Sequence, residues 1–345
     1  MIQQNQITEL FQEISSAKKI LIPISTPDGD AFGSALALKL ILEQMGVTVV
    51  VISSFGTQGI YKKLPNAEKI INEDLYDHNL LKDQDLIIIP DTASLNQLVD
   101  LKKHKDGEFR FPESVKAVNI DHHASNTNFA NLTLLDSKAS SCGEIIYKLF
   151  KDKIKMSHDI ALCLLVAISS DTGHFRYVCN SELLKIAAEL VEYDIDMRGF
   201  IRDYYYTKTP EAMLLTGIAL SRLITDKERK YCLTYLTKKD LEQGNANKDD
   251  LDQAEDEIND NLIQSVDGTD FGIRLSEDKA DYTSGSLRGR TGKVDLNLIA
   301  KEIGGGGHHE AAGFHLRCSL ESALIRVTET VNNILYPSPL RMLRV

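Results

Sequence analysis

The 345-residue chain contains no tryptophan, only five cysteines, and no hydrophobic run close to the ~20 residues that span a bilayer. The cysteines are scattered and odd in number, so we expect reduced thiols rather than a disulfide framework or a zinc knuckle. The first residues, MIQQNQITELFQEISS, lack a basic start followed by an apolar core, which argues against a signal peptide. These absences predict a cytoplasmic protein without a membrane segment.

An excess of positive charge is also missing. The formal net charge is -11, and a negative surface repels long polyphosphate backbones, so binding to long duplex nucleic acid is not expected. A short anionic substrate held by a few local cations and metal ions remains compatible with this charge. Hydrophobic residues make up 43% of the chain, which is enough for two cores.

The first half alternates short β-rich runs with longer helical patterns. Strands are predicted at 19–24, 47–53, 85–89 and 115–120, and helices at 33–45, 181–193 and 211–223. The strands are nearly continuous runs of Val and Ile, which is typical of strands buried on both faces. We therefore expect an α/β fold, with a parallel sheet and helices on both faces.

The second half has a different pattern. It predicts a strand at 230–236, an antiparallel pair at 271–275 and 282–287, and helices at 295–303 and 321–335. The segment NKDDLDQAEDEIND, residues 247–260, is strongly acidic and is expected to be exposed. The expected domains are 1–193, a linker at 194–212, and a smaller α+β domain at 213–345.

Acidic and imidazole side chains follow several apolar runs of the first half. They are Asp28 and Asp30, then Asp91, then Asp121 with His122 and His123, and finally Asp171. Ligands of open α/β sheets bind at the carboxyl ends of the strands. If the sheet is parallel, these side chains converge. Carboxylates with imidazole suit Mn²⁺ or Mg²⁺, and two metals ~3.5–4 Å apart can activate a water and clamp a phosphoryl group.

Each of these groups alone has a plainer interpretation. A DGD sequence is usually a turn, and Asp91 followed by Thr92 suits a helix N-cap. Adjacent histidines are more often surface or core residues than ligands, and Asp171 suits a helix end. Four acidic sites that each follow an apolar run are harder to explain as turns.

The order of the motifs carries a resemblance. PDGDAFGS, DTAS, IDHHASN and SSDTGHF follow one another in the first half, and SLRGRTGKVDLNLIAKEIGGGGHHEAAGF lies in the second. This ordered set resembles the DHH phosphoesterase superfamily with its DHH-associated C-terminal domain, over nearly the whole chain. Within it, the chain is most similar to bacterial oligoribonucleases (nanoRNases) that are also 3′-phosphoadenosine-5′-phosphate (pAp) phosphatases.

The resemblance implies a hydrolase with two Mn²⁺ sites, in which Mg²⁺ or Co²⁺ are alternatives. One Mn²⁺ would be held by Asp30, Asp91, His122 and Asp171, and the other by Asp28 and the shared Asp91. His123 would face the substrate phosphate, and Asp121 would orient the histidines. In the second domain, phosphate would be bound by Ser286, Arg288, Gly305, Gly306, Gly307 and His308, with the glycines at 304–307 contributing backbone N–H groups. His309 and His315 receive no role.

One position departs from the family pattern His-x-x-Pro-Asp-x-Asp. Aligned on Pro27, the histidine position holds Ile24, which has no lone pair and cannot bind a metal. The first metal site would then be weakened. The enzyme would work with one tight and one weak metal, or recruit the second metal with the substrate, or be a degenerate homologue that binds nucleotides without hydrolysing them.

The expected activity is therefore a Mn-dependent phosphodiesterase or phosphatase that uses a metal-activated water. Its expected partners are short single-stranded RNA, pAp or linear dinucleotides, and a homodimer is left open. Two alternatives stay open: a pyrophosphatase or polyphosphatase, and a catalytically weakened nucleotide-binding protein.

Overall fold

The computed structural model describes residues 2–57, 59–75, 78–98, 109, 111–176 and 178–335. The chain divides into two compact units, Met1–Tyr206 and Thr207–Val345. Residues 194–212, expected to be a linker, form α8 (Met197–Ile201), the π-helix η3 (Arg202–Tyr206) and the start of α9 (Pro210–Ser221). Within the described ranges, no helix has the length and hydrophobicity that a membrane crossing requires.

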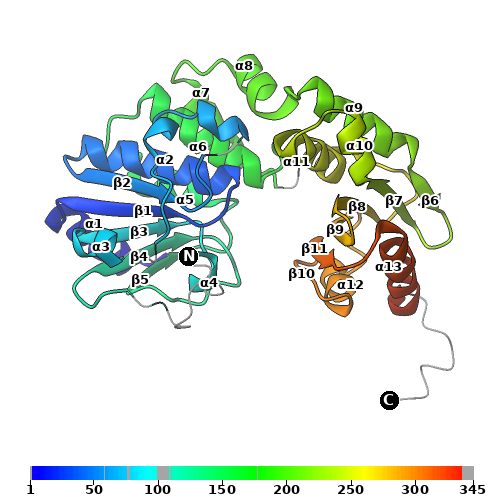
Figure 1. The fold of residues 1–345 in the computed structure, drawn as a ribbon. Coiled ribbons are helices and arrows are strands. Elements are labelled where there is room, and N and C mark those ends of the chain that lie inside the picture. Colours follow the sequence, from blue (N-terminus) through cyan, green and yellow to red (C-terminus); the bar gives the residue numbers. More distant parts are fainter. Residues whose placement is uncertain are drawn as a thin grey trace. The chain divides into compact units, whose positions relative to one another are not determined.

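The N-terminal unit is built on a five-stranded sheet with the order β2-β1-β3-β4-β5 (Figure 1). All four neighbouring pairs are parallel, which confirms the predicted parallel α/β sheet. The strands are β1 (Lys19–Ile24), β2 (Thr48–Ser53), β3 (Leu86–Pro90), β4 (Lys116–Asp121) and β5 (Leu132–Leu135). The short edge strand β5 was not predicted, because four residues give too little pattern to recognise.

Helices pack on both faces of this sheet. The larger core lies on the face covered by α1 (Gln4–Ser16), α2 (Gly29–Gln44), α5 (Cys142–Phe150), α6 (His158–Asp171) and α7 (Ser181–Val191). A smaller core lies on the other face, with α3 (His78–Lys82) and α4 (Leu95–Leu98). The 3₁₀ helices η1 (Gly59–Lys63) and η2 (Ala67–Lys69) follow β2.

Two glycines set the close packing of the helices around the candidate site. A Cβ on Gly33 of α2 would lie 2.5 Å from the backbone oxygen of Cys163 in α6. A Cβ on Gly143 of α5 would lie 2.5 Å from Cβ of Ala167. Only glycine leaves room for these contacts, so the glycines bring α2 and α5 against α6. The DGD motif also begins a helix rather than preceding one, because α2 starts at Gly29.

The C-terminal unit contains a mixed six-stranded sheet with the order β10-β11-β9-β8-β7-β6. Its strands are β6 (Ile224–Asp226), β7 (Tyr231–Leu236), β8 (Phe271–Lys279), β9 (Tyr282–Gly289), β10 (Gly306–Gly307) and β11 (Ala311–Leu316). The predicted pairing of the strands at 271–275 and 282–287 is antiparallel, as expected. The pair β7 and β8 is parallel.

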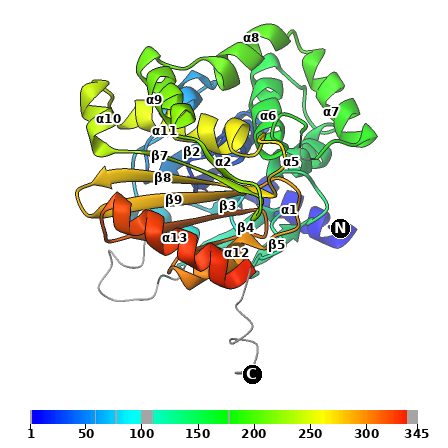
Figure 2. The same cartoon turned by 90° about the vertical axis from the view of Figure 1, so that its right-hand side faces the viewer.

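Two helical layers cover this second sheet (Figure 2). One core joins it to α12 (Leu296–Glu302) and α13 (Leu320–Leu335). A second core joins the opposite face to α9 and α11 (Lys248–Glu257). The helix α10 (Lys238–Gln243) follows β7, and the π-helix η4 (Ile258–Leu262) continues α11.

The acidic segment at 247–260 differs from its expectation. It forms α11 and most of η4, and Leu251, Ala254 and Ile258 are buried in the core. These three residues are spaced by three and four, which places them on one face of a helix. The segment is therefore an amphipathic helix with one acidic face, and not an exposed tract.

Candidate functional site

Four of the expected metal ligands meet around one imidazole nitrogen. Nε2 of His122 lies 3.0 Å from Oδ2 of Asp171, 3.5 Å from Oδ1 of Asp91 and 3.7 Å from Oδ2 of Asp30. One ligand atom from each residue lies within 4.8 Å of all the others. Asp91 and His122 directly follow β3 and β4, whereas Asp30 lies in the first turn of α2 and Asp171 ends α6. The carboxyl ends of the strands thus bring together residues far apart in the sequence.

The carboxylate of Asp30 is held by the start of a neighbouring helix. Its Oδ1 accepts hydrogen bonds from the hydroxyl of Ser34 (2.8 Å) and the backbone N–H of Gly143 (3.0 Å). Its Oδ2 accepts from the backbone N–H of Cys142 at 2.6 Å. These N–H groups open α5, where unpaired donors and the helix dipole stabilise negative charge. Asp30 is fully buried and fixed in one orientation.

Asp91 occupies a backbone conformation that side-chain-bearing residues rarely adopt. Its φ angle is 51°, in the left-handed region, and its N–H donates to the carbonyl of Ile120 (2.9 Å). Its side chain is 4% exposed. Oδ1 of Asp91 and Nε2 of His122 are both buried without a hydrogen-bond partner. Buried polar atoms without a partner destabilise a fold, and a role of these two atoms as metal ligands would explain them.

The charges of this cluster also indicate a cation site. Burial raises the pKa of Asp30 well above its ordinary value, and repulsion from Asp91 and Asp171 adds to the effect. Burial likewise raises the pKa of Asp91. Burial alone would lower the pKa of His122, but the negative charge of Asp171, Asp91 and Asp30 around its Nε2 raises it. The site holds more negative charge than one imidazolium balances, so its oxygen and nitrogen donors fit a hard divalent cation.

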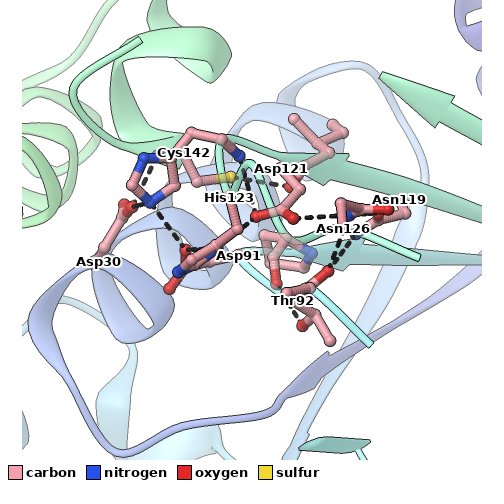
Figure 3. A network of polar contacts seen from close by, with 12 residues as sticks. Asp30, Asp91, Thr92, Asn119, Asp121, His123, Asn126 and Cys142 are labelled. Carbon is pink, nitrogen blue, oxygen red and sulfur yellow. Dashed lines mark hydrogen bonds and ion pairs between the residues drawn. The ribbon is translucent and has the colours of Figure 1, made fainter. Parts of the chain in front are cut away.

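Asp121 and His123 form a second, connected group beside the cluster (Figure 3). Nδ1 of His123 lies 2.7 Å from Oδ1 of Asp121, and Nδ2 of Asn126 donates to Oδ2 of Asp121 at 2.6 Å. Burial raises the pKa of Asp121, but these hydrogen bonds outweigh it and lower the pKa below its ordinary value. The contact with Asp121 also raises the pKa of His123. Asp121 is therefore an ionised residue that fixes the imidazole of His123.

Asp28 is placed differently from the other aspartates. It caps α2, and its Oδ1 accepts from the N–H of Ala31 at 2.9 Å. Among the described residues, the groups whose ligand atoms lie within 4.8 Å of one another do not include Asp28. Desolvation in this partly buried position, with repulsion from Asp91, raises its pKa to about 6.

Ile24 ends β1 and is only 4% exposed. Its side chain belongs to the large hydrophobic core of the N-terminal unit. It therefore contributes packing and no ligand atom.

The C-terminal unit contains a cavity of about 710 Å³. Its floor is one face of β8, β9 and β11, where Ser286 pairs with Arg274 on one side and with Gly313 on the other. Arg288, two residues further along β9, points to the same face because strand side chains alternate. The lining residues are Lys248, Glu255, Asn259, Arg274, Ser284, Gly285, Ser286, Arg288, Gly304, Gly305, Gly306, Gly307, Ala311, Ala312, Gly313, Phe314 and His315.

Most of the expected phosphate-binding residues line this cavity. Nη1 of Arg288 donates to the hydroxyl of Ser286 at 2.7 Å. Gly305, Gly306 and Gly307 line the wall, whereas His308 is not among the lining residues. His315, which was given no role, does line it and stacks on Tyr282 with ring centroids 5.7 Å apart.

The glycine loop presents fewer free N–H groups than expected. The N–H groups of Gly305 and His308 donate to the carbonyls of Ala300 and Ala311, at 2.8 and 2.7 Å. That of Gly307 donates to Oδ1 of Asn297 at 3.1 Å. These donors are therefore engaged within the unit. A Cβ on Gly305 would lie 2.2 Å from the oxygen of Gly313, so the glycines act by leaving space.

Sequence reasoning missed five polar residues of this cavity: Lys248, Glu255, Asn259, Arg274 and Ser284. The first three lie in the segment 247–260, whose acidic residues are typical of a solvated surface. Arg274 lies in β8, and its alternation with Ile273 and Leu275 was the one available signal that it faces away from the hydrophobic core.

Comparisons with known proteins identify two domains in the chain. Residues 19–168 match the DHH family, N-terminal domain, and residues 228–336 match the DHHA1 domain. The chain is 27% identical to "Bifunctional oligoribonuclease and PAP phosphatase NrnA" of Thermus thermophilus, over 93% of this chain and 92% of that protein. It is 26% identical to the protein of the same name from Bacillus subtilis, over 89% and 92%.

Among solved structures, the chain is similar to an exopolyphosphatase-related protein from Bacteroides fragilis, with a TM-score of 0.85 and 26% identity. That likeness covers 96% of this chain and 97% of the other. With a DHH domain followed by a DHHA1 domain, the chain belongs to the DHH family.

Proposed function

We propose that this protein is a divalent-metal-dependent phosphoesterase that hydrolyses short oligoribonucleotides, pAp, or both. The observation that carries the proposal is the convergence of Asp30, Asp91 and Asp171 on Nε2 of His122, with two buried ligand atoms left unpartnered. The family match supports phosphoester chemistry, and the names of two relatives indicate the substrates. Mn²⁺ is the proposed metal, because the ligand set combines carboxylates with imidazole.

The metal would be held by Asp30, Asp91, His122 and Asp171, and Asp28 would contribute to a second, weaker site. A bound divalent cation supplies Lewis-acid chemistry, since it lowers the pKa of water and neutralises phosphoryl charge. Asp121 keeps the imidazole of His123 oriented and favours its protonated form. His123 would then donate a hydrogen bond to the substrate phosphate and stabilise the charge that develops there.

The C-terminal unit would bind a phosphate of the substrate. Arg288 supplies a guanidinium whose geometry matches phosphate oxygens, and Ser286 holds one of its nitrogens in place. Gly305, Gly306 and Gly307 leave room for the ligand. His308 does not line the cavity, and it would contact a part of the ligand that lies outside it. A cavity of about 710 Å³ is within the usual range for a small ligand such as a mononucleotide.

A second function is favoured by Ile24. A buried isoleucine at this position means that the site near Asp28 lacks an imidazole, so a catalytically weakened protein that binds nucleotides is the alternative. A hydrolase of pyrophosphate or polyphosphate is a further alternative, supported by the similarity to the exopolyphosphatase-related protein from Bacteroides fragilis.

The test is an assay of the purified full-length chain with Mn²⁺. Release of mononucleotides from a five-nucleotide RNA is measured beside release of phosphate from pAp and from pyrophosphate, with Asp91→Ala as the control. Turnover of RNA or pAp that the substitution abolishes is the expected result. Turnover of pyrophosphate alone would favour the alternative hydrolase. Nucleotide binding without turnover in Mn²⁺, Mg²⁺ or Co²⁺ would refute the proposal in favour of the binding protein.

A further inference from the structure

The side chain of Asn259 is held in one orientation at the wall of the cavity. Asn259 lies in η4, lines the cavity and is 6% exposed. Its Oδ1 accepts a hydrogen bond from Nε of Arg274 at 3.0 Å. Because a guanidinium has only donors, the amide oxygen must face Arg274 and the NH₂ group must face away. Within the described part of the chain, this NH₂ group has no acceptor, and because Asn259 lines the cavity the group is a donor available to a ligand.

Arg274 is itself locked in position. It is 5% exposed, and its Nη1 donates to Oε1 of Glu255 at 2.7 Å and to the hydroxyl of Ser276. Glu255 lies near the C-terminus of α11, and Asn259 lies in the π-helix η4 that follows. Single turns of π-helix are frequent at functional sites. Arg274 therefore ties the helical wall of the cavity to its sheet floor.

Asn259 and Arg288 border the same part of the cavity. Arg288 lies diagonally across from Arg274, because Arg274 pairs with Ser286 and the same strand continues to Arg288. Residues in this relation are roughly 7–8 Å apart on one face of a sheet. Asp260, which follows Asn259 in the chain, lies 3.5 Å from Nε of Arg288. One anionic group can therefore reach both side chains.

The lining of the cavity selects an acceptor-rich ligand. Among the described residues, the lining contains Lys248, Arg274 and Arg288 and a single carboxylate, that of Glu255. Glu255 is paired with Arg274. The remaining polar groups are mainly donors, and a phosphate group offers several acceptor oxygens to them.

We propose that Asn259 is a specificity-determining residue that donates from Nδ2 to the phosphate group bound by Arg288, and that Arg274 is the positioning residue that orients it. The inference rests on the proposed function, since it assumes that a nucleotide phosphate binds in this cavity. It adds that recognition of this phosphate requires a neutral amide donor beside the guanidinium.

The experiment measures binding by isothermal titration of the full-length chain in EDTA, so that no turnover occurs. The probes are pAp, its uridine counterpart pUp, and adenosine. Asn259→Asp keeps an oxygen for Arg274 but turns a carboxylate toward the ligand, so we expect affinity for pAp and pUp to fall at least tenfold. Asn259→Ser, which removes the amide and keeps a hydroxyl acceptor, is expected to weaken both as well. Arg288→Ala tests the phosphate site itself.

Asn261→Asp is the matched control, because it adds the same charge to η4 at a residue outside the cavity lining. It should bind as the wild type does, and melting temperatures confirm that each variant is folded. If Arg288→Ala weakens binding and the two Asn259 variants do not, the inference fails and the proposed function stands. A loss for pAp without a loss for pUp would mean that Asn259 recognises the base, which also overturns the inference. If none of the variants changes binding, the phosphate role of the cavity fails with it, and turnover with Mn²⁺ tests the metal centre separately.

Discussion

The substitution Asp91→Asn should stabilise the metal-free protein and remove its metal binding. Asparagine is nearly isosteric and tolerates the left-handed backbone at this position, where φ is 51°. Oxygen atoms of Asp91 lie within 4.8 Å of those of Asp30 and Asp171, which gives a repulsion of about 3.5 kcal/mol for each pair at an effective dielectric of about 20. Attraction to protonated His122 at 3.5 Å and to protonated His123 at 3.7 Å is about 4.7 and about 4.5 kcal/mol on the same basis, which offsets these repulsions.

Burial of the charged carboxylate leaves a net cost, because it raises the pKa of Asp91 above its ordinary value, and an uncharged asparagine relieves that cost. For a unit of this size, each kcal/mol relieved raises the melting temperature by about 2–4 °C. The measurement is thermal unfolding in EDTA at pH 8, beside a Mn²⁺ titration. In the presence of Mn²⁺ the wild type should have the higher melting temperature, because the metal stabilises the wild type and not the variant.

Asp121→Asn is the control, and it is expected to change stability in EDTA in the opposite direction. Both oxygens of Asp121 accept hydrogen bonds, so replacing one by an NH₂ group opposes a donor to a donor and costs about 1–3 kcal/mol in EDTA. A drop in melting temperature for Asp91→Asn in EDTA, together with unchanged Mn²⁺ binding, would refute the interpretation of Asp91 as a metal ligand. It would show a carboxylate that serves the fold alone.

Three further outcomes are expected. Since burial raises the pKa of Asp28 to about 6, the folded metal-free chain binds more protons than the unfolded chain and loses stability as the pH rises from about 4 to 6. Mn²⁺ displaces those protons, so the rise in melting temperature that it causes should be larger at pH 8 than at pH 5, and an equal rise would contradict this. Ile24→His should add a second Mn²⁺ per chain in a titration followed by metal analysis, and lower stability in EDTA because a polar ring replaces a core side chain. An unchanged metal content would show that the missing imidazole does not limit the second site. Gly33→Ala should destabilise the protein by about 1–3 kcal/mol in urea unfolding, because its Cβ would lie 2.5 Å from the backbone oxygen of Cys163. A neutral effect would show that α2 and α6 can separate at no cost.

The sequence alone predicted four of the five strands of the N-terminal unit and their parallel arrangement. Runs such as DLIII and VKAVNI carry apolar residues on both faces of the strand, and this pattern is typical of a buried parallel sheet. Because every parallel strand ends at the same edge, residues that follow the strands were expected to meet there. Asp91 and His122 do so. The inference worked because the alternation of strands and helices is a local property.

Only the tertiary structure decided which side chains complete the sites. Asp28 and Asp30 are two residues apart and equivalent in the sequence, yet Asp30 is fixed by the N–H groups of Cys142 and Gly143, more than a hundred positions away. The pairing of Arg274 with Asn259 depends likewise on the packing of η4 against β8. Such contacts follow from long-range packing, which no local pattern records. The acidic residues around Asn259 are typical of a solvated surface, so the sequence did not indicate that Asn259 lines a cavity.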